Sequence, residues 1–258
     1  MTKVVILAGG YGTRLSEETT RIPKPMVEIG GMPMIWHIMK IYSHYGFNEF
    51  IICLGYKGNV IKNYFRDYFM NASQEITFDI EKNSVSYGPA KAEPWKIKLV
   101  DTGLNTMTGG RLKRLKKHLG DEPFFVAYGD CVSDVDINEL LKFHKKKKVK
   151  ATLTSVIPAG RFGILDIENG MVSSFREKQD SDVGWINGGF MVLEPSVLDY
   201  IKNDTVMLEV GPLDKLAKEG NLAAYQHKGF WKPMDNLKDK NDLEELWKNG
   251  PKWKLWKD

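Results

Sequence analysis

The stretch KVVILAGGYGTRL, residues 3–15, joins a short apolar run directly to three glycines and an arginine. The apolar run has the length and composition of a strand that is buried on both faces of a sheet. Glycines after such a strand let backbone amides approach a phosphate closely, and an arginine adds a planar cation that fits phosphate oxygens. The stretch therefore predicts an α/β fold with an anion-binding loop at the carboxyl end of its first strand.

Two common phosphate-binding motifs are excluded for this loop. It lacks the Gly-Lys-Ser/Thr sequence of a Walker A loop, and Leu15 occupies the last glycine position of a dinucleotide-binding GxGxxG sequence. A tight strand-to-loop turn would explain the glycines alone equally well. Two cations favour the anion-binding interpretation: Arg14 in the loop, and Lys24, which stands in a backbone stiffened by Pro23 and Pro25.

Strand-like apolar runs alternate with amphipathic helical patterns through much of the chain. Up to about residue 157 this alternation is typical of parallel strands with helices on both faces of a sheet. From about residue 158 to 258 the strands become shorter and less regular, which favours antiparallel pairing. Predicted strands cover residues 3–8, 49–56, 75–81, 96–101, 123–130, 150–158, 162–168, 171–178, 185–194 and 222–228. Predicted helices cover residues 34–46, 59–70, 109–120, 137–148, 195–202, 207–220 and 236–250.

The composition narrows the class of protein. A chain of 258 residues without a Pro/Gly/Ser-rich linker or an internal repeat favours one domain over residues 1–258. Its apolar runs are too short for a membrane-spanning helix or a secretory signal, so we expect a cytoplasmic protein. Cys53 and Cys131 lie in no CxxC pair or histidine cluster, which argues against a disulfide framework and a structural zinc site.

The densest positive charge is the run His144–Lys148 at the end of a predicted helix. A nucleic-acid patch is one interpretation of this run. However, no stacking aromatic residues interleave with the lysines, and cations are favourable at the carbonyl-rich end of a helix. We therefore expect neither a nucleic-acid nor a membrane partner.

Several motifs together resemble the sugar-nucleotide pyrophosphorylases and, among them, the bacterial glucose-1-phosphate cytidylyltransferase family. The motifs shared with the wider group are LAGGYGTRLSEET at residues 7–19 and KPMVEIGGMPMIWHIMKIYSHYG at 24–46. The combination of TMTGGRLKR at 106–114 with GFWKPMD at 229–235 is more specific to the cytidylyl enzymes. Further matching motifs are YGDCVSD, GRFGILDI, FREK, INGGFMV and the terminal PKWKLW, so the resemblance covers essentially the full chain.

The resemblance implies a Rossmann-like, mixed and mostly parallel sheet flanked by helices, with a smaller antiparallel sugar-binding elaboration. It implies that glucose 1-phosphate attacks the α-phosphate of CTP in line, which gives CDP-glucose and pyrophosphate with Mg²⁺ as cofactor. A phosphate monoester with a second pKa of about 6 is largely dianionic at neutral pH, so the attack needs no general base. The protein must instead act electrostatically: it must hold two anions in line and neutralise the negative charge that builds up on the triphosphate.

The resemblance also assigns residues to these tasks. Arg14 and Lys24 would hold the triphosphate, and Asp130 and Asp235 would be the Mg²⁺ ligands, although Asp235 alone could also be a helix cap. The nucleotide-binding residues would be Leu7, Ala8, Gly9, Gly10, Tyr11, Gly12, Thr13, Arg14, Lys24, Thr108, Arg111 and Gly129. Among these, Thr108 and Arg111 would help to read the cytosine.

The remaining assignments concern the sugar phosphate. Lys178 would contact its phosphate and Glu177 its hydroxyl groups, while Asn187 and Gly188 would complete the sugar pocket. The sequence departs from the family pattern at three positions, which leaves the exact sugar open: Cys131, Gln179 and Gly211.

Two alternatives stay open from the sequence. One is the same nucleotidyl transfer with another sugar 1-phosphate or another nucleoside triphosphate. The other is a non-catalytic regulatory protein that binds a nucleotide. The resemblance further implies a homo-oligomer, and the terminal tryptophans Trp247, Trp253 and Trp256 would pack on the body of the protein or on a neighbouring subunit.

Overall fold

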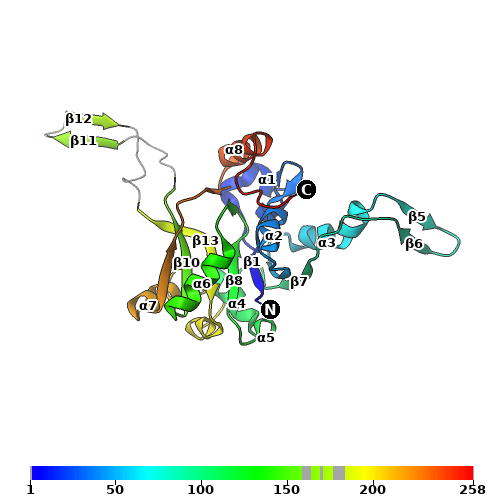
Figure 1. The fold of residues 1–258 in the computed structure, drawn as a ribbon, viewed down its shortest axis with the longest axis horizontal. Helices are drawn as coiled ribbons and strands as arrows, with labels where there is room; N and C mark the ends of the chain where they lie inside the picture. Colours follow the sequence, from blue (N-terminus) through cyan, green and yellow to red (C-terminus); the bar gives the residue numbers. More distant parts are fainter. Residues whose placement is uncertain (1, 159–163, 169–170, 177–183, 258) are drawn as a thin grey trace.

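The central feature of the fold is a seven-stranded sheet with the order β14-β10-β13-β8-β1-β4-β7 (Figure 1). The structure is a computed structural model that describes residues 2–158, 164–168, 171–176 and 184–257. The strands of this sheet are β1 (Val4–Leu7), β4 (Glu49–Leu54), β7 (Lys96–Asp101), β8 (Phe124–Tyr128), β10 (Ala151–Val156), β13 (Ile186–Leu193) and β14 (Leu222–Gln226).

The pairing within this sheet is mixed. β1 runs parallel to β4 and β8, β4 runs parallel to β7, and β10 runs parallel to β14. β13 runs antiparallel to β8 and β10. The predicted mixed, mostly parallel sheet is therefore confirmed.

Helices cover both faces of the sheet because side chains along a strand alternate between the two faces. Val4 and Ile6 face one apolar core with α2 and α6, whereas Val5 and Leu7 face the other with α4, α5 and α7. The helices are α1 (Ser16–Thr19), α2 (Met34–His44), α3 (Gly58–Ala72), α4 (Thr108–Arg114), α5 (Lys116–Leu119), α6 (Ile137–Lys147), α7 (Pro212–Lys218) and α8 (Leu237–Lys248). Among the described residues, 3₁₀ helices are η1 (Thr13–Leu15), η2 (Lys24–Met26) and η4 (Pro195–Tyr200).

In the part of the chain that the structure describes, four two-stranded antiparallel pairs accompany the main sheet. The pair β5–β6 and the pair β11–β12 project from opposite sides of the body (Figure 1). The pair β9–β15 lies next to the sheet edge where β8 ends. The bounds are β2 (Glu28–Ile29), β3 (Met32–Pro33), β5 (Ile76–Asp79), β6 (Ser84–Tyr87), β9 (Cys131–Ser133), β11 (Ile164–Glu168), β12 (Met171–Arg176) and β15 (Trp231–Pro233).

The largest difference from the predicted elements is the helix expected over residues 207–220. The structure has a helix only from Pro212, and the preceding Gly211 has φ of 109°. That backbone conformation is essentially restricted to glycine, and the proline fixes the start of the helix behind it. Residues 207–211 therefore form a separate segment, which becomes important at the site described below.

The terminal tryptophans pack on the body of the same chain around His37 of α2. Trp253 is fully buried, and its indole nitrogen donates to Nδ1 of His37 at 3.3 Å. Nε2 of His37 lies 2.8 Å from the carbonyl oxygen of Ile29. Because Nδ1 accepts a hydrogen bond, Nε2 carries the proton and donates to Ile29. The imidazole is thus held neutral.

This neutral histidine predicts a loss of stability in mild acid. Burial is the main cause that lowers the pKa of His37, from 6.5 to about 4. Between these two pH values the unfolded chain binds a proton that the folded chain does not, so the free energy of unfolding falls as the pH decreases through this window. The loss should reach about 3 kcal/mol at the acidic end.

Denaturant unfolding at several pH values between 7 and 4 would measure this effect. The His37→Gln variant should lose this part of the pH dependence, whereas His44→Gln, at the exposed end of the same helix, should keep it. Identical pH profiles for the wild type and His37→Gln would show that His37 is not the group responsible.

Candidate active site

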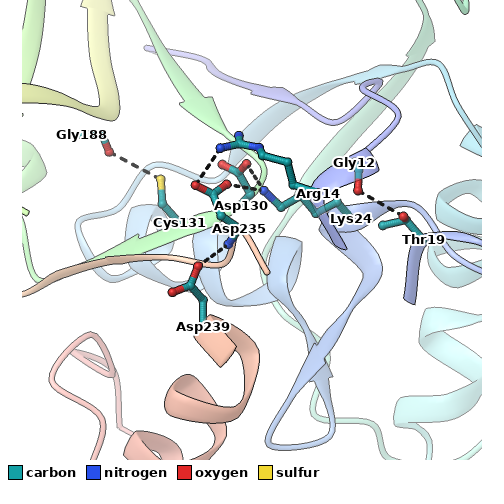
Figure 2. Close-up of polar contacts among 9 residues, drawn as sticks. All are labelled: Gly12, Arg14, Thr19, Lys24, Asp130, Cys131, Gly188, Asp235 and Asp239. Carbon is teal, nitrogen blue, oxygen red and sulfur yellow. Dashed lines mark hydrogen bonds and ion pairs between the residues drawn. The ribbon is translucent and has the colours of Figure 1, made fainter. Parts of the chain in front are cut away.

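Four charged side chains meet where the main sheet ends, and Lys24 lies at their centre (Figure 2). Nζ of Lys24 donates to Oδ2 of Asp130 at 2.7 Å and to Oδ1 of Asp235 at 2.9 Å. Nη1 of Arg14 donates to the other carboxylate oxygen of Asp235 at 3.0 Å. The sequence spreads these residues over more than 200 positions, and the fold brings them into one cluster.

Strand pairing places the two carboxylates side by side. Asp130 follows β8 and precedes β9, and Asp235 follows β15. β15 pairs with β9, and the backbone amide of Met234 donates to the carbonyl oxygen of Asp130 at 2.8 Å. The residues next to Asp235 are therefore fixed against Asp130 by backbone hydrogen bonds.

The helix-cap alternative for Asp235 is excluded by the start of α8. The N-cap of α8 is Asn236, whose side chain accepts from the backbone amide of Asp239 at 3.0 Å. The carboxylate of Asp239 in turn accepts from the backbone amide of Asp235 at 3.0 Å. The capping task is thus done by Asn236, and the Asp235 carboxylate faces Lys24 and Arg14 (Figure 2).

The environment of Lys24 keeps its ammonium group charged. The side chain is only 9% exposed. Burial by itself lowers the pKa of Lys24, but attraction and hydrogen bonds from Asp130 and Asp235 outweigh it and raise this pKa above its ordinary value. Arg14, by contrast, has a side chain that is 72% exposed, so it can turn from Asp235 toward a ligand.

The donor set of this cluster fits a divalent metal ion. Two carboxylates direct their oxygens to one cationic point, which Lys24 Nζ occupies. Mg²⁺ typically takes one or two carboxylates and completes its coordination with phosphate oxygens and water. Within the described ranges no group of three or more His, Cys, Asp or Glu side chains forms a richer metal site. The site therefore suits a metal ion that arrives with a phosphorylated ligand.

Two adjoining hollows lie beside the cluster and share Asp130, Arg14 and Gly129. The smaller, about 240 Å³, is lined by the glycine-rich loop together with Lys24 and Pro25. The larger, about 600 Å³, is lined by the same loop, by residues 104–108 and by Tyr128, Met207 and Glu209. Every residue that we expected to bind the nucleotide lines one of these two hollows.

Arg111 was expected to help read the cytosine, but in the structure its side chain is buried. The residue is only 4% exposed, and its guanidinium group lies beneath the glycine-rich loop. A methyl group on Gly9 would come within 2.2 Å of its Nη1 atom, so the loop can pass over Arg111 only because residue 9 is a glycine. Its Nη atoms donate to the carbonyl oxygens of Gly9, Leu54, Gly103 and Leu104 and to the hydroxyl of Thr102, at 2.8–3.2 Å.

These bonds give Arg111 a supporting role that the sequence did not indicate. Its donors tie the first loop to the ends of β4 and β7, so the guanidinium shapes the floor of the larger hollow. Both terminal nitrogens of Arg111 already donate to protein oxygens. This disfavours the direct hydrogen bond to cytosine that we expected, and favours a structural role for Arg111 beneath the nucleotide-binding loop.

Comparisons with known proteins show the family of this chain. Residues 3–239 match the family described as nucleotidyl transferase. The chain belongs to the nucleotidyl transferase family. A protein of Salmonella typhi named glucose-1-phosphate cytidylyltransferase is 55% identical over 98% of this chain and 99% of its own length. One of Bacillus subtilis, named probable glucose-1-phosphate cytidylyltransferase, is 46% identical over 98% of this chain and its own full length.

Solved structures show the same fold. The crystal structure of HddC from Yersinia pseudotuberculosis has a TM-score of 0.70 and 25% identity, with coverage of 96% of this chain and all of that one. A UDP-glucose pyrophosphorylase from Acinetobacter baumanii gives a TM-score of 0.70 at 18% identity, and coverage of 98% and 95%. No helix in the described segments of this nucleotidyl transferase has both the length and the apolar character needed to span a bilayer.

Beyond the charged cluster, the nucleotidyl transferase has a polar network that the sequence analysis missed. The phenol of Tyr128 donates to one carboxylate oxygen of Glu209, and Oγ1 of Thr108 donates to the other at 2.6 Å. Tyr128 could have been suspected from its place before Gly129 and Asp130 at the end of a buried strand. Glu209 could not, because the sequence pattern placed it inside the helix expected over residues 207–220, whereas the structure starts that helix only at Pro212.

The sugar-side residues are described only in part. Nδ2 of Asn187 donates to the Tyr128 hydroxyl at 3.2 Å, and Oδ1 of Asn187 accepts from the backbone amide of Gly189 at 3.0 Å. The carbonyl oxygen of Gly188 accepts from the Trp231 indole at 2.7 Å. Glu177, Lys178 and Gln179 lie outside the described residues.

The unusual Cys131 is a packing residue in this nucleotidyl transferase. Its thiol is buried and directed toward the carbonyl oxygen of Gly188, 3.5 Å away, rather than toward Lys24 (Figure 2). Burial raises the pKa of this thiol well above its ordinary range, so Cys131 is a neutral group. The charge balance of the neighbouring carboxylates is therefore unchanged by it.

Proposed function

We propose that the chain transfers a cytidylyl group from CTP to α-D-glucose 1-phosphate and releases pyrophosphate and CDP-glucose. The observation that carries the proposal is the carboxylate pair bridged by Lys24 at the mouth of the glycine-rich loop. The names of the relatives that are 55% and 46% identical supply the substrates.

In this proposal Arg14 and Lys24 hold the triphosphate. Lys24 has little freedom because η2 begins at it and Pro23 and Pro25 flank it, so its ammonium group is pre-positioned. Arg14 is exposed and supplies a planar fork that suits phosphate oxygens. Residues 7–13 and Gly129 would hold the base and the ribose, and Thr108 would lie near the base.

Asp130 and Asp235 would hold Mg²⁺. The ion, when bound, neutralises charge on the triphosphate and helps to align it with the attacking phosphate. Both carboxylates are partly exposed, with side chains 29% and 23% accessible, so they can exchange a contact with Lys24 for a contact with a metal ion.

The chemical step needs no side chain to act as a general base. The sugar phosphate oxygen is already an anion and attacks the α-phosphate, the bond to the β-phosphate breaks, and pyrophosphate leaves as an anion. Lys24 and Arg14 then stabilise the charge that gathers on the leaving group. Lys178 would bind the phosphate of the sugar, and Glu177, Asn187 and Gly188 would surround its ring.

Three further properties belong to the proposal. We infer one functional domain over residues 1–258, because β10, β13 and β14 join the same sheet as β1, β4, β7 and β8. We infer a homo-oligomer, supported by two exposed apolar side chains: Phe78 in the projecting strand β5 and Ile80 in the turn that follows it. A pathway from CTP and a sugar phosphate is consistent with a cytoplasmic location.

Pyrophosphate release with Mg²⁺ tests the reaction. CTP, UTP, dTTP, ATP and GTP should each be paired with a panel of sugar 1-phosphates, and we expect turnover with CTP and glucose 1-phosphate. Turnover of CTP with a different sugar would leave the nucleotide assignments standing and overturn those for the sugar. No turnover with any pair would overturn the enzyme proposal in favour of a nucleotide-binding regulator.

A further inference from the structure

Glu209 and Tyr128 of the polar network line the larger hollow, and none of the roles assigned above uses either residue. We propose that Glu209 binds hydroxyl groups of the sugar phosphate and thereby helps to select the sugar. This inference rests on the proposed function and adds to it a specificity residue outside the matched motifs.

The hydrogen-bond inventory of the carboxylate supports this role. Oε1 accepts from the Tyr128 hydroxyl, and Oε2 accepts from Thr108 at 2.6 Å. Each oxygen of a carboxylate can accept two hydrogen bonds, so among the described residues each oxygen of Glu209 keeps one acceptor site. Two neighbouring hydroxyl groups on a pyranose ring provide two donors at a matching spacing.

The two remaining acceptor sites of the Glu209 carboxylate disfavour cytosine as its ligand. The pairing edge of cytosine places an amino donor beside the N3 acceptor. A carboxylate that presents two acceptors would gain one hydrogen bond and repel the N3 lone pair. A sugar diol has no such conflict, since both of its groups can donate.

The position of Tyr128 links Glu209 to the sugar side. The phenol oxygen accepts from Asn187 Nδ2 and donates to Glu209, so two hydrogen bonds connect Asn187 with the carboxylate. Tyr128 also lies two residues before Asp130, which we propose as a ligand of Mg²⁺.

The segment that carries Glu209 is fixed before any ligand binds. The backbone amide of Leu208 donates to Oγ1 of Thr108 at 2.8 Å, and the amide of Gly110 donates to the carbonyl oxygen of Val206 at 3.2 Å. The segment 206–209 is thereby attached to the start of α4. A carboxylate held in this way can discriminate between sugars because it does not have to be ordered by them.

The first test is Glu209→Gln, which keeps the shape of the side chain but replaces one acceptor with a donor. We expect KM for glucose 1-phosphate to rise at least about tenfold, with KM for CTP within about twofold of the wild type. Singly deoxygenated glucose 1-phosphates add a second readout. Loss of the contacted hydroxyl should reduce kcat/KM about tenfold in the wild type and less than about threefold in the variant.

Glu219→Gln is the matched control. Glu219 also accepts from a tyrosine hydroxyl, that of Tyr200, but at an exposed position past the end of α7. This variant should keep the sugar and nucleotide constants of the wild type. Tyr128→Phe provides a second test of the site: it removes the donor that orients Glu209 and should raise KM for glucose 1-phosphate about fivefold without altering that for CTP.

Two results would overturn the inference while leaving the reaction intact. One is an active Glu209→Gln enzyme with unchanged sugar constants. The other is a changed preference between CTP and UTP with no effect on the sugar, which would assign Glu209 to the base. If Glu209→Gln does not fold, an unchanged sugar KM in Tyr128→Phe overturns it. An inactive wild type would overturn the proposed function and this inference together.

Discussion

Replacing Asp130 with asparagine should lower kcat about a thousandfold and leave the fold intact. The substitution removes one charge from the pair of carboxylates proposed to hold Mg²⁺, and charge stabilisation of this kind is worth several kcal/mol in the transition state. Asp130 is partly exposed, and its contact with Lys24 contributes about 1 kcal/mol or less to stability. Pyrophosphate release over a Mg²⁺ titration measures the first effect, and thermal unfolding measures the second.

Asp136→Asn is a suitable control, because it makes the same chemical change six residues further on. Asp136 caps α6 by accepting from the backbone amide of Glu139 at 2.9 Å, and asparagine caps a helix about as well. Activity and stability should both stay close to those of the wild type. Near-normal, Mg²⁺-dependent turnover in Asp130→Asn would contradict the ligand assignment.

Replacing Arg111 with lysine should decrease the free energy of unfolding by about 3 kcal/mol or more. An ammonium group cannot reach the four carbonyl oxygens and one hydroxyl that the guanidinium contacts, so buried acceptors are left without donors. The glycine-rich loop also loses its support at Gly9, so we expect KM for CTP to rise. Urea unfolding and initial rates at varied CTP concentrations measure the two effects.

Arg114→Lys makes the same change on the exposed side of the same helix. Arg114 pairs with Asp204 at the surface, where such contacts contribute about 0–1 kcal/mol. Its unfolding curve should nearly coincide with that of the wild type. If the two variants proved equally stable, Arg111 would not be the buried support that its contacts indicate.

The fold class could be predicted from the sequence because buried parallel strands leave a clear pattern in it. Buried parallel strands need long apolar runs, and these runs are visible between residues 3 and 156. The short pair β9–β15 left no comparable pattern, because three residues are too few to show a period. Yet this pair sets Asp235 beside Asp130, so the convergence of these two proposed metal ligands could be inferred only from the resemblance.

The larger hollow was predictable only in part. The glycine-rich loop and Thr108 belong to motifs, whereas Glu209 depends on hydrogen bonds that residues 206–208 make with the start of α4. Arg111 was predicted as a nucleotide-binding residue and lines this hollow, but its burial was not foreseen, since a basic helical pattern suggests an exposed side chain. The roles of the nucleotide, metal and sugar residues, including Glu177 and Lys178, stay predictions.

Because β13 runs opposite to its neighbours β8 and β10, the connection between β10 and β13 can be changed without changing the loops proposed to bind CTP. β10 leaves the sheet at the edge that holds Lys24 and Asp130, and β13, running the opposite way, enters at that same edge. The connection between residues 157 and 185 is thus tethered at both ends beside the reaction centre. We expect insertions, deletions or exchanges within this connection to change the use of the proposed acceptor sugar, while the loops proposed to hold CTP keep their anchors in β1 and β8.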